Sequence, residues 1–568
     1  MRHGLLAITA MFFATIQARA DDPPLPPIVF QMQPEALVLG SLRGAADMIG
    51  GEKAIKAFNK NLKERFGEKG LEGLDINRPI VGYVVLAPKP QDITAVIALP
   101  ITNEKDFLAL CDRLNRDKHR VDAKDKTLYH LPPLDPRYKA LLRFSEQYAY
   151  IVYGFNPAPH AELKALVPMP KLYDPAERGL IAGRLHFDRI PLAVKLAAPV
   201  LFEEVKKTMF GSFGIDRERN DWFTKAVSPP LEKLATRYFL LAGGADVLTA
   251  RLNIDPEAGN FIAEATLTAK PNSELSKVIA AYKTAPNRFG ALTNHPDTVT
   301  AFHTRAPLFA PEVRTAIVAA IEEGQKQGGN GLGIGLGEKA VMDEFLKGMV
   351  RTIKDSNLDL AVALRGPNKD GWFTLIGGLA FEDTAVLEKE IKAMVNKILP
   401  PAEEERMKWD VDKVGKVGIH TYHFTEDGIL DFTKLFGGEK CIVAFAFAPQ
   451  GVIGVIGPDS VAVLKEVLAA KPVDAPAMEM TANPARIVKA FEKSDPGGLG
   501  IVEIATLLGR DDKKLPVMSI VVDGGKELKA TFTLNLKLLP RLMFADDIAR
   551  ANRDANDGPK PPPPPFAK

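Results

Sequence analysis

Two aspartates and two histidines lie close together in the second half of the chain, and their side chains are of the kinds that bind metal ions. They are Asp410, Asp412, His420 and His423. Carboxylate oxygens and imidazole nitrogens are common ligands of zinc and related ions. The segment also matches an earlier strand-like stretch, and in a strand residues three apart point to opposite faces. His420 and His423 then cannot share one ion, so we predict no metal site.

A glycine-rich run between Gly324 and Gly337 could bring the backbone close to a phosphate group. The dinucleotide-binding pattern fails, because Leu336 stands where a third glycine should follow Gly331 and Gly333. No lysine followed by serine or threonine completes a phosphate-binding loop. We therefore predict a mobile connector between two helices, with no bound cofactor.

Candidates for a catalytic nucleophile are equally weak. The segment Gly211–Gly214 resembles a nucleophile elbow in composition, but the elbow requires a residue between its first glycine and Ser212. Cys111 and Cys441 both lie in apolar stretches, where we expect free, buried and unreactive thiols. No catalytic residue is predicted.

The composition is that of an ordinary globular protein. Of the 568 residues, 46% are hydrophobic and 25% charged, which favours a packed, soluble body. The 73 Lys and Arg nearly balance the 71 Asp and Glu, so the formal net charge is only +2. Nucleic-acid binding through a broad basic surface is therefore not expected.

The first residues have the features of a secretory signal peptide. A charged start at Arg2 precedes an apolar run from Leu5 to Ile16 and the small residues Ala18 and Ala20. A membrane anchor is the alternative, but the run is shorter than the ~20 residues that span a bilayer. We expect signal-peptide residues 1–20, a periplasmic or extracellular protein, and no transmembrane segment in the mature chain.

Pro-rich stretches bracket the folded part of the chain. We interpret residues 21–35 as a Pro-rich linker and 547–568 as a Pro-rich disordered tail. Between them, apolar residues recur at every second position on both sides of turns rich in Gly, Pro, Asn and Asp, which predicts antiparallel hairpins. The predicted hairpin strands are 80–86 with 93–99, 248–254 with 261–267, 358–364 with 373–381, and 517–522 with 528–534.

The hairpins are followed by helix-like segments in a repeating order. Helical patterns begin near Thr102 or Asn103 and again near Asp383 or Thr384, each directly after a hairpin. We therefore predict an α+β fold with two tandem duplicated domains, 36–295 and 296–546. Each domain is expected to be an antiparallel β-sheet built from hairpins, with helices packed on one face.

The stretch from Lys69 to Asp75, followed by Arg78, Pro79 and Ile80, resembles a segment of uncharacterised secreted proteins of planctomycete-type bacteria. The apparent signal peptide, the Pro-rich ends and the repeated hairpin-helix units are similar as well. The resemblance implies an envelope location, and it implies no activity and no functional residue.

Two functions remain open from the sequence. The first is a non-catalytic secreted or periplasmic protein that binds a partner protein or an apolar ligand in a cleft between the domains. The alternative is a secreted hydrolase whose site is assembled from residues distant in sequence.

We predict that the exported protein begins at Asp21, because Ala18 and Ala20 form the small-x-small site that signal peptidases cleave. N-terminal sequencing of the protein from an envelope fraction should return Asp21. Recovery of Met1 from that fraction would contradict this prediction.

Overall fold

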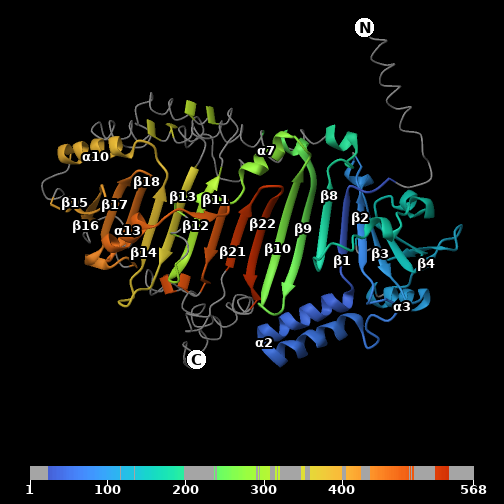
Figure 1. Cartoon of the computed structure of the whole chain (residues 1–568). Helices are drawn as coiled ribbons and strands as arrows, with labels where there is room; N and C mark the ends of the chain where they lie inside the picture. Colours follow the sequence, from blue (N-terminus) through green and yellow to red (C-terminus); the bar gives the residue numbers. More distant parts are fainter. Residues whose placement is uncertain are drawn as a thin grey trace, which may run out of the picture. The chain divides into compact units, whose positions relative to one another are not determined.

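The chain folds into α-helices and antiparallel β-strands, seen in the computed structural model of Figure 1, which confirms the α+β class. The described residues are 24–196, 240–306, 358–398, 405–423, 435–484 and 518–536, apart from 88, 116, 133–134, 290–291 and 293–294, with short pieces at 236, 314–315, 318–319, 347–348, 350–351, 486–487 and 489–490.

Contacts along the chain define two compact units. The first comprises Met1–Glu203 and Asp246–Pro256, and the second Glu204–Ala245 and Glu257–Lys568. The domain boundary expected near His295 falls inside the second unit. The duplication and its domain limits stay a prediction.

The first unit contains strands that all pair antiparallel with their neighbours. In order across its sheet they are β4 (Arg120–Val121), β5 (Leu128–Leu131), β6 (Lys139–Ser145), β7 (Tyr148–Gly154), β3 (Thr94–Pro100), β2 (Ile80–Val85), β1 (Ile28–Met32), β8 (Ile181–His186) and β9 (Ala245–Asp255). The strand β1 lies in the stretch interpreted as a linker, which corrects that interpretation: its alternating apolar side chains pair it with β2 and β8.

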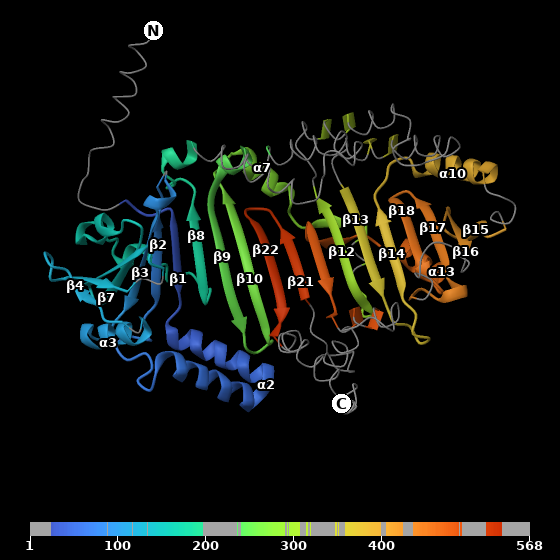
Figure 2. The ribbon, with the colours of Figure 1, turned by 180° about the vertical axis from the view of Figure 1, so that it is seen from behind.

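The first unit has helical segments on both faces of its sheet. The helix α3 (Glu104–Asn115) begins at Asn103, whose side chain accepts the backbone N–H of Asp106, and it packs against Ile151 on β7. The segments η2 (Ala158–Ala161) and α4 (Met169–Leu172) belong to the cluster around Tyr150 and Val152, with η3 (Leu163–Ala165) between them in the chain. Along β7, Ile151 points to the face that α3 covers, and its neighbours Tyr150 and Val152 point to the opposite face. The long helix α2 (Glu35–Phe66) lies below the lower ends of β1 and β8 in Figures 1 and 2.

The second unit repeats this plan of antiparallel pairing. Its strands in order are β15 (Met407–Val414), β16 (Val417–His423), β17 (Ile442–Ala448), β18 (Gly451–Gly457), β14 (Thr374–Leu379), β13 (Leu358–Arg365), β12 (Thr298–Ala306), β20 (Met478–Ala482), β21 (Met518–Asp523), β22 (Leu528–Asn535) and β10 (Asn260–Ala269). The short strands β11 (Ala285–Asn287) and β19 (Val473–Ala475) form a separate pair. The helix α7 (Glu274–Ala281) follows β10, and its N-cap Ser273 accepts the N–H of Ser276.

The helices α10 (Thr384–Ile398) and α13 (Ser460–Ala469) lie on opposite faces of the second sheet. Along β17, Ala444 and Ala446 pack with Leu464 of α13, whereas Phe445 and Phe447 pack with α10. Neighbouring strand residues point to opposite faces, so the expectation that helices cover one face is wrong. The alternation of apolar residues in the sequence indicates that each strand has two different faces. It does not indicate which helix covers each face.

Several expectations fall outside the described residues. They are the signal peptide 1–20, the Gly211–Gly214 loop, the Gly324–Gly337 run and the tail 547–568. Among the helices that are described, none has the length and apolar character needed to cross a membrane.

Truncation of Leu464 tests the packing of α13, because this side chain is fully buried among the alanines of β17. Leu464→Ala should lower the free energy of unfolding by about 2–5 kcal/mol through the cavity that it leaves. Val386→Ala on the exposed side of α10 is the control, with an expected change of about 0.5 kcal/mol or less. Urea unfolding measures both, and equal effects would contradict the packing described.

Candidate functional site

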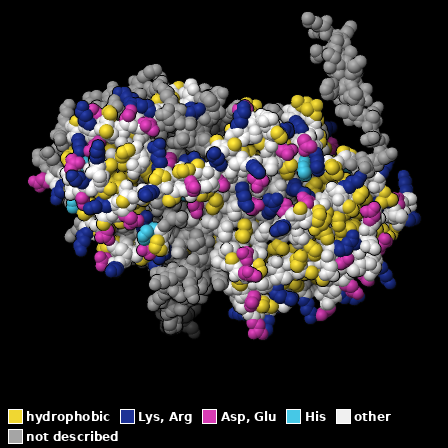
Figure 3. Space-filling view, viewed as in Figure 1, with side chains coloured by type: hydrophobic (Ala, Val, Ile, Leu, Met, Phe, Trp, Pro, Cys, Tyr) yellow, Lys and Arg dark blue, Asp and Glu magenta, His cyan; other side chains and the backbone are white. Residues whose placement is uncertain are grey.

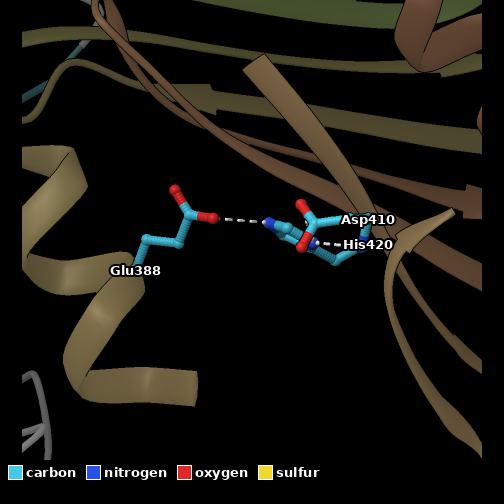
Figure 4. Close-up of side chains that lie close together, drawn as sticks. All are labelled: Glu388, Asp410 and His420. Carbon is cyan, nitrogen blue, oxygen red and sulfur yellow. Dashed lines mark hydrogen bonds and ion pairs between the residues drawn. The ribbon is translucent and has the colours of Figure 1, made fainter. Parts of the chain in front are cut away.

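Glu388, Asp410 and His420 form the only group of three possible metal-ligating side chains found within the described part of the chain. They come from α10, β15 and β16, and Figure 4 shows the imidazole between the two carboxylates. The cluster brings together two of the four residues considered from sequence, Asp410 and His420, and adds Glu388 from a helix.

A bulge in β15 places Asp410 beside His420. Lys408 pairs with Thr421 and Asp412 with Ile419, so the three residues from Trp409 to Val411 stand opposite His420 alone. Asp410 has a φ of 52°, which is uncommon outside glycine. A Cβ at Gly418 would collide with the Asp410 carboxylate, so a larger residue there would displace this side chain.

His420 is fully buried in an aromatic environment. Its ring centroid lies 5.0 Å from that of Trp409 and 5.4 Å from that of Phe445. A substrate in solvent therefore cannot reach the imidazole without displacing one of these neighbours.

The hydrogen bonds of His420 assign its tautomer. Its Nδ1 accepts the backbone N–H of Asp410 at 3.1 Å, so in the neutral ring the proton is on Nε2. Nε2 lies 3.2 Å from Glu388 Oε1, but the contact is not aligned as a hydrogen bond and Nε2 is buried without one. The contact is therefore an electrostatic one between an N–H and a carboxylate.

Lys392 neutralises both carboxylates of the cluster. Its Nζ lies 2.7 Å from Glu388 Oε1, 3.0 Å from Asp410 Oδ2, and 5.4 Å from the centroid of the Trp409 ring. Burial acts to lower the pKa of Lys392, but the two carboxylates outweigh it and raise the pKa. Lys392 stays charged and occupies the place where a cation would bind.

A metal ion does not fit this cluster. A metal ligand needs a lone pair on Nε2, and the assigned tautomer places a proton there. An ion would also have to displace the ammonium group of Lys392. The residues therefore form an internal charge network that attaches α10 to the sheet.

The remaining sequence candidates lie apart from this cluster. Asp412 pairs with Lys465 of α13 at 2.9 Å, while His423 ends β16, three residues beyond His420. Cys111 and Cys441 are buried and unpaired, and burial raises the pKa of the Cys111 thiol to about 12. Neither thiol has the lowered pKa of a reactive cysteine.

A second kind of site lies on the sheet of the first unit, where one face is apolar at every position over neighbouring strands. Residues paired across strands point to the same face. The face is formed by Ile80, Gly82 and Val84 of β2, Ile28, Phe30 and Met32 of β1, Ile181, Gly183 and Leu185 of β8, and Leu248, Ala250 and Leu252 of β9.

This apolar face remains partly open to solvent. The directly paired side chains of Ile181 and Leu252 are 42% and 40% exposed. Farther along the same face, α3 covers β7. The opposite face carries the ion pairs Arg184 with Asp174 and Arg251 with Glu177.

The second unit has a corresponding apolar face. Val362 of β13 and Met480 of β20 flank Phe302 of β12 in register, and their side chains are 38% and 36% exposed. The neighbouring rows add mainly aliphatic residues: Leu360, Leu364, Met478, Ala482, Met518, Ile520 and Val522, with Thr300 and Thr304. Exposed apolar patches of this kind mark binding surfaces.

Charged side chains are distributed differently. On the face seen in Figure 3, lysines and arginines are interspersed with aspartates and glutamates, without a large region of one sign. This view gives no support to a polyanionic or polycationic ligand.

Sequence reasoning missed Glu388 and Lys392, although a signal was present. They stand four residues apart on a predicted helix, the spacing of a helical ion pair. The bulge that turns Asp410 toward them has no comparable sequence pattern.

No protein-family model, curated protein or solved structure matches the chain. The resemblance noted around Lys69–Ile80 stays a prediction.

Acidification is expected to destabilise the fold through His420. Burial and the nearby Lys392 lower its pKa in the folded chain, outweighing Glu388 and Asp410, so the unfolded chain binds a proton first. The stabilising contribution is complete above about pH 6.5, the ordinary histidine value. It is lost as the pH falls from there toward the folded pKa.

Urea unfolding from about pH 7.5 to about pH 5 measures this loss. In His420→Gln, which cannot titrate, the decrease in unfolding free energy over this range should be smaller. The same decrease in both proteins would contradict the assignment.

Proposed function

We propose that the chain is an exported, non-catalytic protein of the periplasm or cell exterior that binds an apolar ligand. The observation that carries the proposal is the continuous apolar sheet face, with Ile181 and Leu252 partly exposed in one of its outer rows. Keeping such a face in water is unfavourable by roughly 25 cal/mol per Å². A ligand that covers it recovers this free energy.

The proposal places the ligand on a sheet face within a unit, in place of the interdomain cleft suggested by sequence. The paired rows of β2, β1, β8 and β9 have no side-chain hydrogen-bonding group, so they offer dispersion and burial and no polar recognition. An unidentified protein partner is the less favoured occupant, since protein interfaces usually add a polar rim.

The hydrolase alternative has weaker support. Within the described residues, the one close group of three acidic and histidine side chains is the network around His420. Its imidazole is buried and its carboxylates are engaged by Lys392. A general base must reach the proton that it abstracts.

We also propose that the two halves of the chain arose by duplication. The pairing order β4-β5-β6-β7-β3-β2-β1-β8-β9 has a counterpart in β15-β16-β17-β18-β14-β13-β12-β20-β21. The helices α3 and α10 each follow the strand that pairs with β7 or β18. Superposition of the two halves in an experimental structure tests this.

Replacing the exposed aliphatic pair tests ligand binding. Ile181→Ser with Leu252→Ser should weaken binding of the apolar dye Nile red to the full chain by about ten-fold, because each change removes apolar contact and adds a hydroxyl. Leu163→Ser is the matched control, since Leu163 is also exposed but lies on η3, away from this face. Fluorescence titration measures the affinities.

No binding of the dye by the wild-type chain, or equal affinity in the double variant and the wild type, would overturn the proposal. Native mass spectrometry of protein purified from its own host should in addition detect a co-purifying apolar molecule.

A further inference from the structure

The imidazole of His420 holds the bulge of β15 through a hydrogen bond that it can accept only when neutral. Its Nδ1 accepts the backbone N–H of Asp410 at 3.1 Å. An imidazolium carries an N–H on both ring nitrogens and therefore has no lone pair for this bond. Protonation of the ring would set two donors against each other at the position where Asp410 has a φ of 52°.

The charged groups beside His420 come from α10 and β15 (Figure 4). Glu388 Oε1 lies 3.2 Å from Nε2, and Asp410 Oδ1 lies 3.7 Å from Nδ1. Lys392 is paired with both of these side chains. Burial of the ring and the charge of Lys392 outweigh the two carboxylates and hold the pKa of His420 below its ordinary value. The closed arrangement therefore favours the neutral ring.

The helix α10 covers an apolar cluster next to this ring. Leu387 of α10 is buried against Phe447 of β17, and Ile391 packs on the same cluster. The rings of Phe445 and Phe447 face His420 from β17, with centroids 5.4 and 6.0 Å away, and they carry no charge. Release of α10 would expose this cluster to water.

This corner of the second unit can open while the rest of the sheet stays folded. Among the described strands, β15 pairs with β16 alone. The strands β16, β17 and β18 pack on α13 through their opposite face, by Ile419, Ala444 and Ile453. Segments at the margin of a sheet open at a lower free energy than its centre does.

We propose that His420 is a pH-sensitive switch whose protonation in mild acid releases α10 and the bulge of β15. When the corner opens, the hydrogen bond from the Asp410 N–H breaks and Nδ1 takes a proton from solvent. The imidazolium then opposes reclosure, because closing would bury its charge and restore the clash of two donors. The inference does not depend on the proposed ligand site, which lies in the first unit.

Hydrogen exchange of the full chain at pH 7.5 and pH 5 tests the switch, with each rate corrected for the intrinsic effect of pH on exchange. Below about pH 6.5, uptake of one proton on opening raises the opening constant by up to about ten-fold per pH unit. Protection of Thr384–Ile398 and Met407–Val414 should therefore fall by about ten-fold between the two conditions. Protection of α13 is the internal control and should not change.

Two variants isolate the titration. His420→Gln keeps a side-chain oxygen that can accept the Asp410 N–H but cannot titrate, so the response of α10 to acid should disappear. His303→Gln is the matched control, since His303 is also buried but lies on β12, and it should keep the wild-type response.

Lys392→Met separates the switch from simple attachment of the helix. Loss of its ion pairs should lower the protection of α10 already at pH 7.5. It also removes the cation that lowers the pKa of His420, so the further loss of protection at pH 5 should be smaller than in the wild type.

Three results would overturn the switch. They are unchanged protection of α10 in the acidified wild type, an equal response in His420→Gln, and joint loss of protection in α10 and α13. If His420→Gln does not fold, the comparison with Lys392→Met decides, and an undiminished acid response in that variant contradicts the proposal.

Discussion

The fold depends on one constraint, the alternation of side chains along each strand. In both units apolar residues occupy both strand faces over part of the sheet, so each face must be covered. Leu464 of α13 covers one face of β17, and α10 covers Phe447 on the other. Where described helices end, as over Ile181 and Leu252, the same alternation leaves aliphatic side chains partly in solvent. The proposed binding face is therefore a consequence of incomplete cover by the described helices.

The charge network around His420 follows from the same geometry. The bulge in β15 turns Asp410, whose side chain is 60% exposed, toward the face that α10 covers. Lys392 and Glu388 supply the opposite charges from the helix. Lys392 and Glu388 are only 28% and 24% exposed, and their ion pairs help to attach this helix to the sheet. Its likeness to a metal or catalytic site comes from composition alone.

The sequence predicted local structure well and tertiary placement poorly. The hairpin strand expected at 93–99 is observed as Thr94–Pro100, and the helix expected after Thr384 is observed as Thr384–Ile398, because both patterns depend on neighbours in the chain. The strand β1 was missed because it is short and stands among prolines. The approach of Glu388 to His420 could not be predicted, since it requires the bulge at Trp409–Val411 and the choice of sheet face by α10. Asp412 faces away from the cluster and pairs with Lys465 of α13. This placement could not be predicted either, because it depends on which sheet face each helix covers.

Glycines within the strands lower strand stability, and some of them make room for a neighbouring side chain. Each glycine in a strand costs roughly 0.5–1 kcal/mol relative to alanine, and a paired Gly377 and Gly454 doubles that cost at one place. At Gly82 and Gly378 an aromatic ring in the same chain offsets the cost by close packing against the backbone. At the paired glycines, no described atom lies within 4 Å of an added Cβ. Sites where a local rule of strand stability is broken are where function is expected. By this argument the charge network is a weak candidate for a ligand site, because the chain's own residues already neutralise its charged groups.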